Sequence, residues 1–184
     1  MEKIMKSTLF ITQTAFMLAL LLGVQFITRP FGQFVTGSLV NLILLVSLFM
    51  IGLGSGVTVG MLSPFLAFFA GIGPALPQVI PFMAVGNALL VLVARLVSKY
   101  MAKNNLKDII FASIGLFLAS TAKFLFLWVG LVIIALPLIP GLKEQQLTML
   151  GAAFSWPQLV TALIGSTLAM MIVPILKRAK VNIE

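Results

Sequence analysis

Lys123 is the residue of this sequence whose surroundings most directly imply chemistry. It stands in the middle of an apolar stretch that runs from Ile109 to Leu136. Placing an ammonium group at such a position in a membrane costs about 2.5–3.5 kcal/mol on insertion scales. The charge must therefore be paired, hydrated or bound to a ligand, and an anionic or amide-bearing ligand is the natural counterpart. We interpret Lys123 as part of a binding site; the alternative is a lysine that snorkels to the lipid headgroups.

The sequence lacks the residue types on which most catalytic and metal sites depend. It contains no histidine and no cysteine, which excludes thiolate nucleophiles, Ser-His-Asp triads and the usual zinc sites. The four carboxylates, Glu2, Asp108, Glu144 and Glu184, lie at the ends of apolar segments, so no segment carries a buried acid for a proton or sodium relay. A G-x-x-x-x-G-K phosphate loop is also absent. We predict a non-catalytic protein without metal or cofactor, and energy for any transport would have to come from a partner.

The composition identifies the class of fold. Of the 184 residues, 61% are hydrophobic and 9% are charged, which is typical of an integral membrane protein. The apolar runs are continuous rather than alternating, so they predict helices and not barrel strands. We predict an all-α integral membrane protein, a six-transmembrane-helix bundle that forms a single membrane domain over residues 1–184. The expected helices are about 8–28, 38–53, 55–72, 79–101, 109–136 and 152–176, and the boundary between the second and the third is the least defined.

The basic residues indicate the topology. The formal net charge is +8, which in a soluble chain would suggest nucleic acid. With the N-terminus inside and six spans, most lysines and arginines fall at inside ends, as the positive-inside rule requires. We therefore predict cytoplasmic termini and no nucleic-acid partner. The inside set is Lys3, Lys6, Arg95, Lys99, Lys103, Lys107, Lys177, Arg178 and Lys180, and the outside set is Arg29 and Lys143.

The other polar side chains of the expected helices concentrate toward the outside. A rise of about 1.5 Å per residue places Lys123 in the outer half of the bilayer and Asn87 at a similar depth. The alternative for the amides is hydrogen bonding between helices, and for the tryptophans anchoring at the interface. The predicted binding residues are Asn41, Gln78, Asn87, Lys123, Trp128 and Gln158.

Small residues recur at four-residue spacing in two places. Ala15 and Ala19 form one pair, and Gly52, Gly56 and Gly60 form a series. Such spacing places small side chains on one face of a helix, where another helix can approach closely. We expect the glycine series to serve packing within the bundle.

Several segments resemble a known family. They are Ala15–Ala19 in a basic-flanked first helix, Gly60–Ala67, Gly71–Pro74, Gly86-Asn87 and Ser155–Ala162. Together with six helices in so short a chain, they resemble the substrate-binding S components of energy-coupling factor (ECF) vitamin transporters.

The resemblance implies a high-affinity vitamin-binding subunit of a prokaryotic plasma membrane. Such a subunit docks on one membrane scaffold (T) subunit and two ATPase subunits, and it is thought to topple in the membrane to deliver its ligand. By the same resemblance, Ala15 and Ala19 would contact the scaffold, and the loop from Arg29 to Thr36 would gate the pocket. Cobalamin and pantothenate are the favoured vitamins, with folate and pyridoxine as alternatives. Lys123 favours a carboxylate, whereas the Phe-rich interior favours a corrin ring.

Two other classes remain as alternatives. One is a self-contained carrier or pore formed when copies of the chain oligomerise. The other is an intramembrane enzyme, for which a Ser/Lys dyad would be needed. Ser120 and Thr121 are close to Lys123 in sequence, but neither lies at an i+4 position. The enzyme is the less favoured of the two.

Overall fold

The structure is a computed structural model, and it describes residues 2–74, 76–101 and 105–181. No strand occurs among these residues. The helices are α1 (Glu2–Thr28), α2 (Gly32–Met50), α3 (Leu53–Phe69), α4 (Ile80–Arg95), α5 (Leu106–Leu125), α6 (Leu136–Leu138), α7 (Glu144–Ala153) and α8 (Trp156–Val181), joined by the 3-10 turns η1 (Arg29–Phe31) and η2 (Pro77–Val79) and the π-helical segment η3 (Phe126–Ala135).

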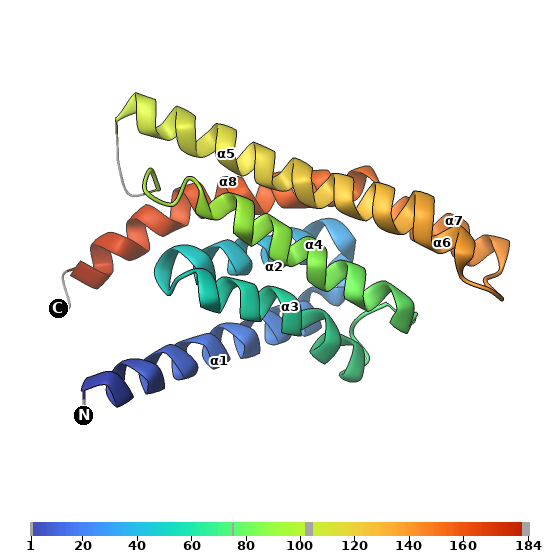
Figure 1. The fold of residues 1–184 in the computed structure, drawn as a ribbon, viewed down its shortest axis with the longest axis horizontal. Coiled ribbons are helices and arrows are strands. Elements are labelled where there is room, and N and C mark those ends of the chain that lie inside the picture. The colour runs from blue at the N-terminus through green and yellow to red at the C-terminus, as the bar shows by residue number, and fades with distance from the viewer. Residues whose placement is uncertain (1, 75, 102–104, 182–184) are drawn as a thin grey trace.

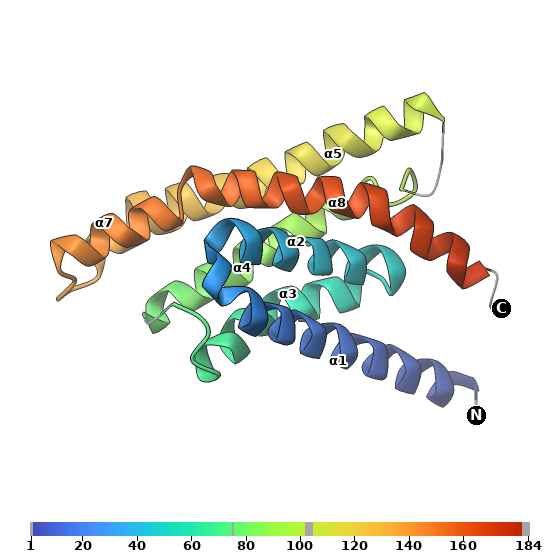
Figure 2. The same cartoon turned by 180° about the vertical axis from the view of Figure 1, so that it is seen from behind.

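The long helices pack side by side in one bundle. In the two views, α1 forms one side, α5 and α8 form the other, and α2, α3 and α4 lie between them (Figures 1 and 2). The core among these helices consists of aliphatic side chains such as Leu44, Leu45, Leu90 and Val91, which are fully or almost fully buried. Large apolar side chains also cover the outside of the bundle, as expected where the solvent is lipid.

Four apolar helical stretches of the described chain are long enough to cross a membrane. They are Met5–Met50, Pro77–Arg95, Leu106–Leu138 and Glu144–Ala179, and Leu53–Phe69 is a shorter apolar helix. The protein is therefore an all-helical membrane protein. The first stretch contains both α1 and α2, which pack against each other after the turn at η1 (Figure 1).

The connection between α1 and α2 differs from the sequence prediction. We expected a loop from Arg29 to Thr36 and a helix from residue 38, but α2 begins at Gly32 directly after η1. Gly32 has a φ of +80°, a value that glycine adopts at little cost, and it allows the chain to reverse within a few residues. Thr36 Oγ1 then donates to the Thr28 carbonyl oxygen at 2.9 Å. The segment predicted to be a gating loop is thus helical and tied to the end of α1.

The later helices also depart from the predicted boundaries. Helix α4 ends at Arg95, because the next amides bond to carbonyls three residues back and form turns. The predicted helix 109–136 extends from 106 to 138 and contains η3. The predicted helix 152–176 is part of two helices, α7 and α8, and Pro157 in the first turn of α8 explains the break, since proline has no amide hydrogen with which to continue α7.

The glycine series has two structural roles. Gly52, with a φ of +136°, makes the turn between α2 and α3. Gly56 and Gly60 face α4, where an added Cβ would lie 2.8 Å from Val91 Cγ1 and 3.3 Å from Asn87 Cβ respectively. The prediction that this series serves packing within the bundle is confirmed for these two glycines.

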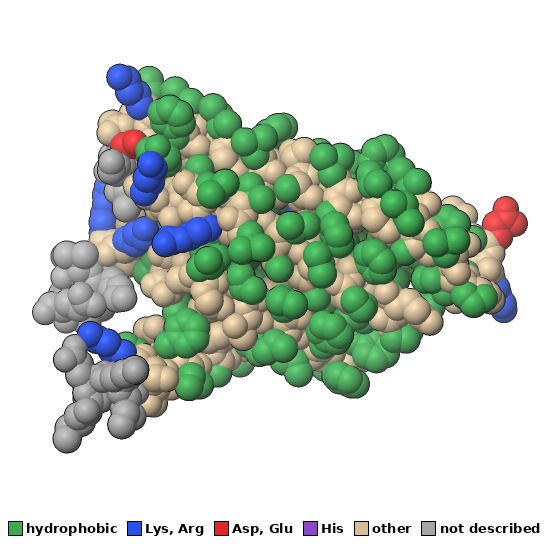
Figure 3. Space-filling view, viewed as in Figure 1, with side chains coloured by type: hydrophobic (Ala, Val, Ile, Leu, Met, Phe, Trp, Pro, Cys, Tyr) green, Lys and Arg blue, Asp and Glu red, His purple; other side chains and the backbone are tan. Residues whose placement is uncertain are grey.

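Charged side chains mark the two ends of the bundle. Figure 3 shows lysine and arginine side chains concentrated at the end that holds both termini. Acidic and basic side chains lie next to each other at the far end. Lys103, Asn104 and Glu184 lie outside the described residues, as do the side chains of Glu2, Lys3 and Lys180. We call the end of the bundle that holds both termini the basic end. Its described basic residues, placed by their positions in the helices, are Lys6, Arg95, Lys99, Lys107, Lys177 and Arg178.

Candidate functional site

Lys123 is held by amide side chains from two other helices. Its Nζ donates to Asn41 Oδ1 of α2 at 2.6 Å and to Asn87 Oδ1 of α4 at 2.7 Å. Asn87 Nδ2 donates in turn to the Gly60 carbonyl oxygen of α3 at 3.2 Å. Lys123 is 4% exposed, so the two amide oxygens supply acceptors that water would otherwise provide. The contact brings together Lys123 and Asn87, the two residues predicted to lie at a similar depth.

A cavity of about 360 Å³ adjoins this group. Its walls come from the end of α1, η1, the first half of α2, the end of α3 and the segment after it, α4, α5, η3 and the α7–α8 junction. These segments place it in the half of the bundle away from the basic end (Figure 1). Its polar lining residues are Gln25, Arg29, Gln33, Thr36, Asn41, Asn87, Lys123 and Gln158.

Several of these side chains brace the cavity wall. Gln33 Nε2 and Gln158 Nε2 both donate to the carbonyl oxygen of Ala153, at 2.5 and 3.2 Å, and so join α2 and α8 to the end of α7. Arg29 Nη1 donates to the Gly71 carbonyl oxygen at 3.1 Å. Gln25 Oε1, in contrast, is buried and has no hydrogen-bond partner within the described chain.

The structure brings together four of the six predicted binding residues. Asn41, Asn87, Lys123 and Gln158 line the cavity, whereas Gln78 and Trp128 lie outside its described lining. Gln78 is exposed in η2. Trp128 is 40% exposed and stacks on Phe124 with ring centroids 5.8 Å apart. It follows Lys123 by five residues, which is more than one helical turn, and so its side chain lies on another face.

Sequence reasoning missed Gln25 and Gln33 as lining residues. Gln25 is the one polar residue between Ala15 and Ile27 in the first helix, and this signal was available in the sequence. Gln33 fell in the segment expected to be a loop. The π-helical segment directly after α5 was also missed, because its sequence is uniformly apolar and gives no local sign of a change in helix type.

Gly165 sets the distance between α2 and α8 next to Asn41. A Cβ added there would lie 2.6 Å from Asn41 Cβ and 2.7 Å from the Ser38 carbonyl oxygen. We expect Gly165→Ala to force the helices apart, lowering stability by about 1–3 kcal/mol and weakening ligand binding by displacing Asn41. Thermal unfolding of the purified protein measures the first effect and calorimetric titration the second.

Gly23→Ala is the matched control for this prediction. Gly23 is also a helical glycine, but an added Cβ there would meet no atom of the described chain within 4 Å. We expect unchanged or slightly higher stability, since alanine favours helix more than glycine. Equal stabilities for the two variants would contradict the assigned role of Gly165.

A separate surface feature lies on α1. Ala15 and Ala19 are exposed, and Gly23 continues their spacing by another four residues. The buried residues Thr14 and Leu21 are on the side of α1 that faces the bundle. The structure therefore presents a stripe of small residues, Ala15, Ala19 and Gly23, on the outside of α1.

A comparison with protein families gives a match over most of the chain. The family described as "ECF transporter, substrate-specific component" matches residues 13–177, from α1 to near the end of α8. The chain belongs to this family. As an S component, it is a non-catalytic, substrate-binding subunit of a transporter and a multi-pass protein of the prokaryotic plasma membrane. Membership also implies a small substrate and the partner subunits of an ECF module. No curated protein and no solved structure gives a significant match to this S component.

Proposed function

We propose that this S component binds a small anionic vitamin, or a related micronutrient, in the cavity beside Lys123. The observation that carries the proposal is the anchored ammonium group, held by Asn41 and Asn87 at the cavity wall. An ammonium has three hydrogen-bond donors, and two of them are used by the asparagines. The third can donate to a ligand carboxylate, which would also neutralise the buried charge.

The size of the cavity supports a ligand like pantothenate over cobalamin. Its volume of about 360 Å³ is near the lower end of the range of about 300–1,000 Å³ found for small-molecule sites. A corrinoid is several times larger than pantothenate. Of the two vitamins that the sequence favours, pantothenate is therefore the better fit.

The unpaired acceptor of Gln25 adds a second requirement. A buried oxygen without a partner is costly unless the ligand supplies a donor, and Gln25 Oε1 belongs to a residue that lines the cavity. A carboxylate that also carries a hydroxyl or amide N–H would satisfy both Lys123 and Gln25. Pantothenate has all of these groups.

We further propose that the chain forms six spans with cytoplasmic termini and an outward-facing cavity. The fold of α1 back onto α2 and the concentration of charge at the basic end support this topology. The cavity then receives its ligand from outside. Delivery requires the scaffold and the two ATPases, with the small-residue stripe of α1 as the docking surface.

The absence of cysteine makes the topology directly testable. We expect Lys143→Cys to react with a membrane-impermeant maleimide in intact cells. Lys107→Cys should react only after the cells are permeabilised, because it lies at the basic end. Labelling of the two sites in the opposite order would contradict the proposed orientation.

The ligand proposal is tested with the purified protein. Mass spectrometry identifies any co-purified small molecule, and calorimetric titration with a vitamin panel gives affinity and stoichiometry. We expect tight one-to-one binding of a pantothenate-sized carboxylate and none of cobalamin. Tight binding of cobalamin would overturn the proposed ligand class. Solute flux through liposomes that contain this chain alone would instead support the carrier or pore.

A further inference from the structure

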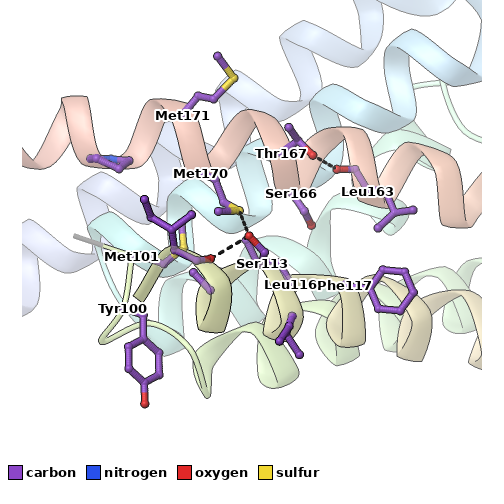
Figure 4. Close-up of a pocket in the computed structure, with 14 residues that line it drawn as sticks. Tyr100, Met101, Ser113, Leu116, Phe117, Leu163, Ser166, Thr167, Met170 and Met171 are labelled. Carbon is purple, nitrogen blue, oxygen red and sulfur yellow. Dashed lines mark hydrogen bonds between the residues drawn. The ribbon is translucent and has the colours of Figure 1, made fainter. Parts of the chain in front are cut away.

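A second and larger hollow lies between α5 and α8, toward the basic end. This α5–α8 groove has a volume of about 710 Å³. Figure 4 shows the two helices running along it, with Ser113 and Met170 facing each other across it and Tyr100 and Met101 at one end. Its walls are mainly apolar and include three methionines, Met101, Met170 and Met171, whose flexible side chains adapt to an irregular occupant.

The serine and threonine hydroxyl groups of the groove are already satisfied by the protein. Ser113 Oγ donates to the Ile109 carbonyl oxygen at 2.8 Å, and Thr167 Oγ1 to the Leu163 carbonyl oxygen at 2.9 Å. Ser166 and Ser120 hydrogen-bond to each other at 3.1 Å. The groove thus differs from the cavity at Lys123, which contains a charge and an unpaired acceptor. It suits a hydrocarbon chain rather than a polar solute.

The length of the groove corresponds to one leaflet. Along α8 it extends from Leu163 to Pro174, a separation of 11 residues that spans roughly 16 Å at about 1.5 Å per residue. The hydrocarbon core of a bilayer is about 30 Å thick, so each leaflet contributes about half of that. One acyl chain of a single leaflet therefore matches the groove in length.

Basic residues lie in the segments next to the end of the groove at which a headgroup would lie. Lys177 is half-buried and follows Pro174 by one turn of α8. Lys107 is exposed in the first turn of α5, and Lys99 lies 4.9 Å from the ring centroid of Tyr100, which lines the groove. Asp108, also at this end, is buried. Anionic lipid headgroups bind where basic side chains lie beside a pocket between membrane helices.

From the groove and its charges we propose that the α5–α8 groove binds an anionic phospholipid. One acyl chain lies along the groove, over the contact of 3.7 Å between Ser113 Oγ and Met170 Sδ, and the phosphate is held by Lys177 and Lys107. The proposal is independent of the vitamin, because it uses none of the residues that line the cavity at Lys123.

The proposal is tested by titrating the delipidated protein in detergent with dioleoyl phosphatidylglycerol or dioleoyl phosphatidylcholine and counting bound lipids by native mass spectrometry. We expect the anionic lipid to bind more tightly by about fivefold for each lysine that contacts the phosphate. Lys107→Gln with Lys177→Gln should remove this preference. Thr167→Trp, which fills the groove, should remove tight binding of both lipids.

Matched controls separate the groove from general effects. Lys143→Gln removes a charge at the far end, and Thr148→Phe enlarges an exposed threonine of α7 that also donates to the carbonyl four residues back; both should bind lipid as the unmodified protein does. Ser113→Phe fills the groove from α5 in case Thr167→Trp fails to fold. Equal affinity for the two lipids, or full affinity in a folded groove-filling variant, would overturn the proposal. The proposal would also be overturned if a groove-filling variant still bound the lipid but no longer assembled with the scaffold subunit.

Discussion

Lys123→Ala is expected to weaken binding of the vitamin by about 10- to 150-fold, which corresponds to the roughly 1.5–3 kcal/mol of a charge-assisted hydrogen bond. The structure gives the reason: the ammonium group is fixed by Asn41 and Asn87 at the wall of the cavity, so little rotamer freedom remains to be lost when the ligand binds. Isothermal titration calorimetry on the purified variant measures the loss.

One further variant separates the charge of Lys123 from its packing, and another serves as a control. Lys123→Gln retains hydrogen-bond donors without the positive charge, and it should lose nearly as much affinity as Lys123→Ala if the ligand is anionic. Lys143→Ala removes a lysine that is exposed at the start of α7 and should leave binding unchanged. Unchanged affinity in a folded Lys123→Ala protein would remove Lys123 from the site.

Ala15→Leu combined with Ala19→Leu is expected to abolish uptake in cells while leaving ligand binding intact. Both alanines are exposed on α1, so leucines can be accommodated without disturbing the bundle. They would, however, prevent the close helix approach that a docked scaffold needs. Uptake of radiolabelled vitamin and titration of the purified variant are compared for the same protein.

Ala152→Leu is the control for this pair, since Ala152 is also exposed but lies on α7. It should leave both uptake and binding unchanged. Loss of ligand binding in the double variant would contradict a docking role and indicate that the stripe packs within the bundle. Normal uptake would show that the scaffold contacts another surface.

The class of fold and the centre of the site follow from simple sequence features. Continuous apolar runs predicted membrane helices, and counting residues from the expected helix ends placed Lys123 and Asn87 at one depth. Charge burial required a partner for Lys123. That partner was expected to be a ligand, whereas the structure supplies two amides from the chain itself, Asn41 and Asn87, before any ligand binds.

Other features depended on contacts that a sequence pattern does not encode. Residue spacing predicts which residues share a helix face only if the helix type and its ends are known. The early start of α2 at Gly32 brings Gln33 into the site, and the position of Trp128 beyond a full turn from Lys123 takes it away. Gly165 gave no signal in the sequence. Its role is to let α2 pack closely against α8, and these two helices are far apart in the chain.

The most direct test of the site compares pantothenate with panthenol, its uncharged alcohol analogue, by calorimetry on the unmodified protein and on Lys123→Ala. We expect pantothenate to bind the unmodified protein about 10- to 150-fold more tightly than panthenol, and this difference to disappear in the variant, as a double-mutant cycle requires when two groups interact. Equal affinities for the unmodified protein, or a preference that survives in Lys123→Ala, would contradict the proposal that Lys123 receives the carboxylate of a small vitamin, and no binding of either compound would contradict pantothenate as that vitamin.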